Sequence, residues 1–309
     1  MFCRIVSVRR KESVRNQMKQ NGRDISTAKM GRYQVHIQIF AVIVTTLILP
    51  LGICVVLSEQ IPSVWIYLAC LYYLVLYYVT PWAVVSLYLR DLWLIVLVCL
   101  LLWKGNWVVV AGITFLLVVV SLLSYKTTHK SSIYINNPSN HRLYVLQGGY
   151  SKLLNHHWNN LSQRFAVDLV GINHFGRRAL GLYPKSLEEY ICFGADVISP
   201  IDGVVVHAES HHKDHAIGEF SIHNPFGNMI IIEDEKGYQL VFAHLLQNSV
   251  SLSKGDYVKH GQVIGQIGNS GNTTEPHLHI HAQTIVKGEI HGVPLCIGKR
   301  NAIRNRVID

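Results

Sequence analysis

Residues 277–282 read His-Leu-His-Ile-His-Ala, and this stretch decides how the second half of the chain is interpreted. Imidazole and apolar side chains alternate, which is typical of a strand with one apolar and one functional face. His277 and His279 would then point to one site, and His281 would extend the same face. Imidazoles bind metals and transfer protons near neutral pH. The pattern alone is more typical of a plain polar strand face, so its interpretation as a site depends on the rest of the chain.

Other short runs of strand-forming residues surround this stretch and are separated by turn signals such as Asn-Pro-Phe-Gly at 224–227 and Asn-Ser-Gly-Asn at 269–272. Short strands at this spacing predict an all-β antiparallel sandwich or barrel. A helical patch is expected near residues 185–190. The predicted strands cover residues 203–208, 228–233, 238–243, 262–267 and 277–282.

The composition of the whole chain differs from that of a soluble protein. The chain has 309 residues, of which 50% are hydrophobic and only 15% are charged. The charge deficit is confined to residues 36–124, which are interrupted by only four charged side chains, Glu59, Arg90, Asp91 and Lys104. This distribution excludes a purely soluble protein and a disordered one.

The apolar region predicts three or four transmembrane helices within residues 35–124. The run at 36–58 is long enough to span a bilayer, and further runs follow at 64–89, 92–103 and 107–123. The run at 92–103 is short for a crossing, so it is either re-entrant or merged with a neighbour. We expect Arg90 and Asp91 to form a pair in a loop at a helix end.

Residues 1–34 carry nine lysines and arginines against two acidic residues. A basic tail of this kind usually stays in the cytoplasm. The predicted protein is therefore a multi-pass protein of the cell membrane, in contact with the lipid bilayer, and an odd number of spans puts its C-terminal domain outside. No nucleic-acid partner is expected, because the basic residues have no accompanying aromatic pattern. The remaining boundaries are a linker at 125–142, a β domain at 143–290 and a C-terminal tail at 291–309.

Two further side chains in apolar runs are candidates for a site. Asp168 lies in Phe-Ala-Val-Asp-Leu-Val, and a buried carboxylate is costly unless it is paired or bound to a metal. His244 lies in Val-Phe-Ala-His-Leu. The chain has no Cys-x-x-Cys pair, so a thiolate zinc site is not expected.

The β domain resembles the lysostaphin/LytM-type zinc metallopeptidases, which cleave the peptide cross-links of bacterial peptidoglycan. The resemblance covers roughly residues 164–283 and follows the order of motifs in that family. The matching stretches are Phe-Gly-Ala-Asp-Val-Ile-Ser-Pro-Ile-Asp-Gly-Val-Val at 193–205, Phe-Gly-Asn-Met-Ile-Ile-Ile at 226–232, Val-Phe-Ala-His-Leu at 241–245, Val-Lys-His-Gly-Gln-Val-Ile-Gly at 258–265 and Gly-Asn-Thr-Thr-Glu-Pro-His-Leu-His-Ile at 271–280.

The resemblance implies a zinc site and a mechanism. Asp168 and His279 match zinc ligands, while His244 and His277 match the histidines that flank the zinc-bound water and stabilise the transition state. Zinc would lower the pKa of its water to about 7 and polarise the scissile carbonyl. Three protein ligands and one open position are the expected catalytic arrangement.

One position departs from the family pattern. The first family ligand is a histidine four residues before the aspartate, and here that position is Arg164, which stays protonated and cannot bind zinc. A histidine from Asn-His-His at 155–157 could replace it. We favour His157, although nothing in the sequence excludes His156. Alternatively, the site is degenerate and the domain only binds.

Three functions follow from these features. The first is a membrane-anchored zinc endopeptidase acting on peptidoglycan or another peptide with small residues. The second is a non-catalytic scaffold or regulator of cell-wall hydrolases, for which Arg164 is the main support. The third is a carrier or histidine phosphocarrier domain, because residues 255–267 also resemble the hairpin of such domains. The third is the weakest, because no lysine at a hairpin tip is evident.

Overall fold

The computed structural model describes residues 80–103, 132–152 and 154–309, together with residues 72, 73, 75, 77, 112 and 115. The basic tail and most of the predicted membrane spans lie outside these residues. Within the described residues, no helix is both long enough and apolar enough to cross a membrane. The predicted three or four spans therefore stay predictions.

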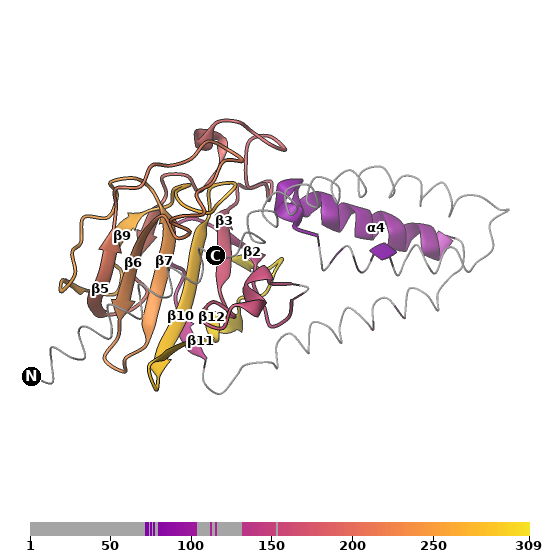
Figure 1. Ribbon diagram of the computed structural model, residues 1–309. Helices are drawn as coiled ribbons and strands as arrows, with labels where there is room; N and C mark the ends of the chain where they lie inside the picture. The colour runs from indigo at the N-terminus through magenta and orange to yellow at the C-terminus, as the bar shows by residue number, and fades with distance from the viewer. Residues whose placement is uncertain are drawn as a thin grey trace, which may run out of the picture.

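The helix that is described in the apolar region starts earlier than the sequence indicates. After Pro81, a short 3-10 helix η1 (Trp82–Val84) precedes α4 (Leu87–Trp103), which runs away from the sheet (Figure 1). Arg90 and Asp91 lie inside α4 and pair with each other, with Nε and Oδ1 2.8 Å apart. The prediction of a loop at this pair was wrong. The break comes at Pro81 instead, since proline disfavours helical backbone in the preceding residue.

The C-terminal part is a β domain, as predicted, and its long sheet carries the site. In the described part of the chain this sheet has the order β14-β2-β3-β10-β7-β6-β5-β8, with β11 paired to β10. All its pairings are antiparallel. Its strands are β2 (Leu143–Gln147), β3 (Val167–Gly171), β5 (Gly203–Glu209), β6 (Asn228–Glu233), β7 (Gln239–Leu245), β8 (Tyr257–Val258), β10 (Leu278–Val286), β11 (Glu289–Val293) and β14 (Val307–Ile308).

Two smaller sheets complete the β domain. One joins β4 (Asp196–Ile198) to β9 (Val263–Gln266), and the other has the order β1 (Ile133–Ile135), β12 (Leu295–Ile297), β13 (Arg300–Asn301). The helical patch expected near 185–190 is the 3-10 helix η3 (Leu187–Glu189). The five predicted strands correspond to β5, β6, β7, β9 and β10.

The two faces of the long sheet carry different kinds of side chain. One face is apolar and packs against residues of both small sheets, such as Val197, Ile264 and Ile297. This burial provides the main hydrophobic stabilisation of the fold. The opposite face carries Asp168 on β3 and His279 on β10, which are direct neighbours in the register.

The edge of this second face is covered by the chain segment that precedes α4. Trp82 and Leu87 pack against Tyr144 of β2 and Val170 of β3, and Trp82 is only 1% exposed. A backbone hydrogen bond of 2.9 Å from Arg178 to the carbonyl of Ala83 holds the segment in place. The apolar region is therefore attached to the β domain by packing as well as by the connecting chain.

The β domain also extends beyond residues 143–290. β1 lies in the segment that we expected to be a linker and pairs in parallel with β12, while β14 lies in the expected tail and pairs with β2. These short strands lack the alternation or turn signals that identify strands in sequence. They form because the long and small sheets offer them open edges.

Candidate metal and catalytic site

The centre of the site is Asp168, which is 4% exposed. The Nε2 atom of His157 lies 3.1 Å from each of its carboxylate oxygens, and Nδ1 of His279 lies 2.9 Å from Oδ1. His277 Nε2 and His156 Nε2 are farther away, at 3.7 Å from Oδ1 and 3.9 Å from Oδ2. Four imidazoles therefore surround one carboxylate.

The charges of this cluster depend on burial and on mutual contact. Burial opposes ionisation of Asp168, but the His157 ring and its hydrogen bond to the carboxylate outweigh burial and hold the pKa of the carboxyl well below its usual range. Burial lowers the pKa of His279 to about 4. Burial also places the pKa values of His156 and His244 well below the usual range. These buried rings are thus neutral near pH 7, which is the form that binds a metal.

The 3-10 helix η2 (His156–Asn159) brings His157 to Asp168. Its N-cap is Asn155, which is fully buried and whose Oδ1 accepts a hydrogen bond of 3.1 Å from the backbone N–H of His157. The Asn155 amide donates to the carbonyls of Gly149, Arg164 and Ala166, at 3.2, 3.3 and 3.0 Å. The Asn155 side chain therefore forms hydrogen bonds to η2, to the segment before it and to the segment after it.

Arg164 does not point its charge into the cluster. Its guanidinium carbon lies over the ring of Trp158, 5.2 Å from the centroid, and its Nε donates to the Trp158 carbonyl at 3.4 Å. A cation–π contact of this kind stabilises the position of the aromatic ring. The arginine at the usual ligand position thus helps to hold the turn that carries His156 and His157.

His244 reaches the site through an unusual backbone conformation. It lies in β7 with a φ of 61°, in the left-handed region, next to a register shift between β6 and β7. Such a conformation costs about 1 kcal/mol or more for a residue with a side chain. Its Nδ1 must donate to the carbonyl of Ser270 at 2.9 Å, since a carbonyl only accepts. In the neutral ring, Nε2 therefore carries a free lone pair.

His277 has the same arrangement in the loop before β10. Its Nδ1 is 2.9 Å from the carbonyl of Glu275 and 3.1 Å from the hydroxyl of Thr273, so Nδ1 is the protonated atom. Glu275 in turn forms a buried pair with Arg178, with Oε2 2.8 Å from Nη2. The centroids of the His277 and His244 rings are 4.7 Å apart.

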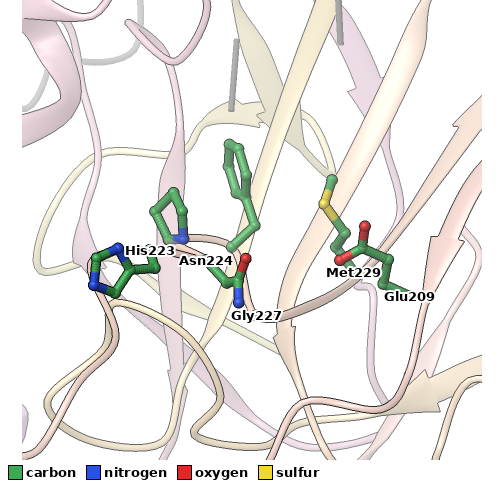
Figure 2. Close-up of a pocket in the computed structure, with 7 residues that line it drawn as sticks. Glu209, His223, Asn224, Gly227 and Met229 are labelled. Carbon is green, nitrogen blue, oxygen red and sulfur yellow. The ribbon is translucent and has the colours of Figure 1, made fainter. Parts of the chain in front are cut away.

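A pocket lies beside the cluster, and Phe226 lines the pocket and lies near His279. The Phe226 ring is 6.2 Å from the ring of His279 and also lines the pocket. Figure 2 shows Glu209 and Met229 on one side of this pocket and His223 and Asn224 on the other. The pocket itself contains no residue of the Asp168 cluster.

The donor set fits a zinc ion. Imidazole nitrogens and a carboxylate oxygen are typical zinc ligands, and a catalytic site uses three of them. Among the described residues, His156, His157 and Asp168 have potential ligand atoms that all lie within 4.8 Å of one another. The Nδ1 atom of His156 is buried and has no hydrogen-bond partner. His156 and His157 belong to this group together and His279 does not, so the geometry allows His156 as a ligand beside His157 as well as in its place.

The five residues that we predicted as metal ligands or catalytic histidines come together in this structure. They are His157, Asp168, His244, His277 and His279. Their assignment as ligands or proton carriers stays a prediction. Sequence reasoning missed the positioning residues, including Asn155 and the Arg178–Glu275 pair. An asparagine directly before two histidines is a recognisable N-cap signal, whereas the Arg178–Glu275 contact joins residues 97 positions apart and has no local signal.

The histidines at 211, 212 and 215 lie in the loop between β5 and β6. The loop is held by Asn228, whose side chain accepts from the backbone N–H of His212 at 2.7 Å and donates to the carbonyl of Leu245 at 2.9 Å. Asn228 is thus a fully buried structural residue at the start of β6.

Comparison with known proteins identifies the domain. Residues 190–291 match the model of peptidase family M23. The chain carries an M23 peptidase domain. Peptidoglycan DD-endopeptidase ShyA of Vibrio cholerae is 34% identical over 138 residues, which are 41% of this chain and 27% of that protein. Lysostaphin of Staphylococcus staphylolyticus is 37% identical over 100 residues, 32% of this chain and 20% of lysostaphin.

A crystal structure of a zinc-containing peptidase from Vibrio cholerae is 30% identical to this chain and covers 32% of it and 26% of the other chain, with a TM-score of 0.25. The chain spans less than a third of the length of the curated relatives that it matches. The M23 match includes His244, His277 and His279, whereas Asp168 and His157 precede it.

Proposed function

We propose that this protein is a membrane-anchored zinc endopeptidase that hydrolyses peptide bonds of peptidoglycan. The observation that carries the proposal is the convergence of His157 and His279 on Asp168, with His244 and His277 beside them. The M23 match and the similarity to ShyA, a peptidoglycan DD-endopeptidase, support the substrate class.

In this proposal, His157, Asp168 and His279 hold the zinc. Bound there, zinc supplies Lewis-acid activation of a water molecule and of the scissile carbonyl. Asp168 contributes the negative charge that offsets the charge of the ion, and its low pKa keeps it ionised. Burial of the cluster strengthens each of these electrostatic interactions.

His244 and His277 are proposed to act as general base and general acid. Each ring presents an unprotonated Nε2, because each Nδ1–H is bonded to a backbone carbonyl. Either Nε2 can accept the proton that the attacking water loses, and the resulting N–H can donate to the developing oxyanion or the leaving amine. The carbonyl at Nδ1 stabilises the imidazolium that forms.

A scaffold function is the alternative, and Arg164 is the observation that favours it. A domain that has lost a ligand could bind peptidoglycan without cutting it. The contact between His157 and Asp168 supports the enzyme, because it brings a third candidate ligand to the carboxylate in place of Arg164.

The membrane location is part of the proposal. Its support is the apolar sequence of residues 36–124, the basic tail and the apolar side chains that α4 leaves exposed, Tyr88, Leu92 and Ile95. A wall peptidase must face outward. Protease treatment of intact spheroplasts should therefore degrade the β domain, and a domain that is digested only after lysis would contradict the cell-wall substrate.

The enzymatic test uses the full chain, purified in detergent and loaded with zinc, and purified peptidoglycan. We expect release of soluble fragments and new amino termini, loss of both with a chelator, and recovery with zinc. His277→Ala should reduce the rate by about 10²- to 10⁴-fold. His260→Ala is the matched control, because His260 is exposed and bonded to Asn136.

Two outcomes would contradict the enzyme. One is a zinc-loaded chain that binds peptidoglycan but releases nothing, which would favour the scaffold. The other is cleavage that persists unchanged in His277→Ala, which would move the chemistry to a different site.

A further inference from the structure

A line of polar side chains, buried except for the half-buried Glu233 at its end, runs from the metal ligand candidate His279 to the edge of the site face. His279 Nε2 lies 3.0 Å from His281 Nδ1, and His281 Nε2 lies 3.2 Å from Gln283 Oε1. The line continues on β7, where Gln283 Nε2 donates to Gln239 Oε1 at 2.9 Å. It ends with Gln239 Nε2 donating to Glu233 Oε2 at 2.8 Å.

The direction of every proton in this line is fixed from its far end. Gln239 presents its NH₂ group to the Glu233 carboxyl oxygen and its own amide oxygen to Gln283. Gln283 then presents its NH₂ group to Gln239 and its oxygen to His281. His281 Nε2 must therefore carry a proton, and Nδ1 of the neutral ring accepts.

The consequence for His279 is a single tautomer. Its Nε2 donates to His281, so its Nδ1 carries a lone pair, and this atom lies 2.9 Å from Oδ1 of Asp168. A lone pair and a carboxylate oxygen at this distance repel each other unless a cation is shared between them. His279 is 2% exposed and His281 is fully buried, so water does not readily supply other partners.

We propose that Glu233, Gln239, Gln283 and His281 form a proton-ordered chain that holds His279 as its Nε2–H tautomer and reserves Nδ1 for the metal ion. His281 is the positioning residue that acts directly on His279. This inference rests on the proposed zinc site and adds the residues that prepare one ligand for it. Metal-binding histidines commonly donate their second ring N–H to a partner, and loss of such a partner weakens binding about 10- to 100-fold.

The first test measures zinc affinity of the full chain in detergent by competition with a chelator. His281→Leu removes the acceptor for the His279 Nε2–H. His279 can then adopt the Nδ1–H tautomer and donate a hydrogen bond to Asp168, and this hydrogen bond competes with metal binding at Nδ1. We expect a loss of affinity of about 10- to 100-fold. His281→Asn should recover most of it, because Oδ1 of asparagine stands near the position of Nδ1 in histidine and accepts the same proton.

His207→Leu is the matched control. His207 lies on β5, in the same cross-strand row as His281, and its Nε2 contacts Glu209 at 3.1 Å rather than the Asp168 cluster. The zinc affinity of the His207→Leu chain should equal that of the unmodified chain. Equal affinities for His281→Leu and the unmodified chain would overturn the inference.

The second test separates this inference from the proposed function. Nitrogen-15 NMR of histidine-labelled chain reports which ring nitrogen of His281 is protonated, with the resonance assigned by its absence in His281→Asn. Protonation at Nε2 with an unprotonated Nδ1 is expected with and without zinc. Protonation at Nδ1 of His281 overturns the inference. An unmodified chain that binds no zinc overturns the proposed function instead, and the NMR measurement then still decides the proton order.

Discussion

Asn155 holds the substitute ligand in place, so its removal gives a sharp test of the site. The Asn155→Ala change deletes one acceptor and two donors from a fully buried position. The backbone N–H of His157 and the carbonyls of Gly149, Arg164 and Ala166 lose a partner. The side chain makes the equivalent of three hydrogen bonds, one through its oxygen and two through its amide N–H groups, which three carbonyls share. At about 1 kcal/mol for each buried hydrogen bond, the expected loss of stability is about 3 kcal/mol.

A loss of this size lowers the unfolding temperature of a domain of this length by roughly 6–12 °C. Zinc affinity should fall as well, because η2 no longer has the cap that directs His157 to Asp168. Thermal unfolding of the full chain in detergent and chelator competition measure the two effects. Asn160→Ala is the control, since Asn160 lies in the same loop and caps the N–H of Ser162.

Unchanged unfolding temperature and unchanged zinc affinity in Asn155→Ala would refute this reasoning. A loss of stability with full zinc affinity would show that the ligand is not the residue that this turn positions.

Three further predictions concern backbone strain, pH and the docking of the segment before α4. His244→Gly should be more stable than His244→Ala by about 1 kcal/mol in thermal unfolding, because glycine accepts the φ of 61° without strain; equal stabilities would contradict the strained backbone. The metal-free chain should lose stability as the pH falls from 6.5 to about 4, because burial lowers the pKa of His279 and the unfolded chain takes up its proton first. This single group contributes about 3 kcal/mol, and a flat unfolding profile across that window would contradict it. Trp82→Ala should cost about 3–5 kcal/mol and increase protease cleavage between α4 and the β domain, whereas unchanged cleavage would show that the segment is a simple tether.

The sequence predicted the central strands of the site well, for a physical reason. The stretch at 228–233 is short, almost entirely apolar and bounded by turns, and the stretch at 277–282 alternates, so both have patterns typical of strands. β2 was not among the predicted strands. All five of its residues are buried, on one face by the core and on the other by Trp82. That second cover comes from a segment about sixty residues away.

The site was predictable where it depends on strand alternation and not where it depends on loops. Asp168 and His279 are paired by sheet register, which their apolar surroundings indicate. The choice between His156 and His157 depends on the turn that Asn155 caps, and the role of Arg164 depends on the ring of Trp158. These are contacts of individual side chains, and no periodicity in the sequence encodes them.

The most direct test of the account is the zinc content of the purified full chain and of four single variants, measured by elemental analysis after loading and dialysis. We predict about one zinc per chain, loss of this zinc in Asp168→Asn, His157→Ala and His279→Ala, and its retention in His156→Ala. Zinc that persists in Asp168→Asn, or an unmodified chain that retains none, would contradict the central claim that Asp168 and the two histidines in contact with it form a metal site.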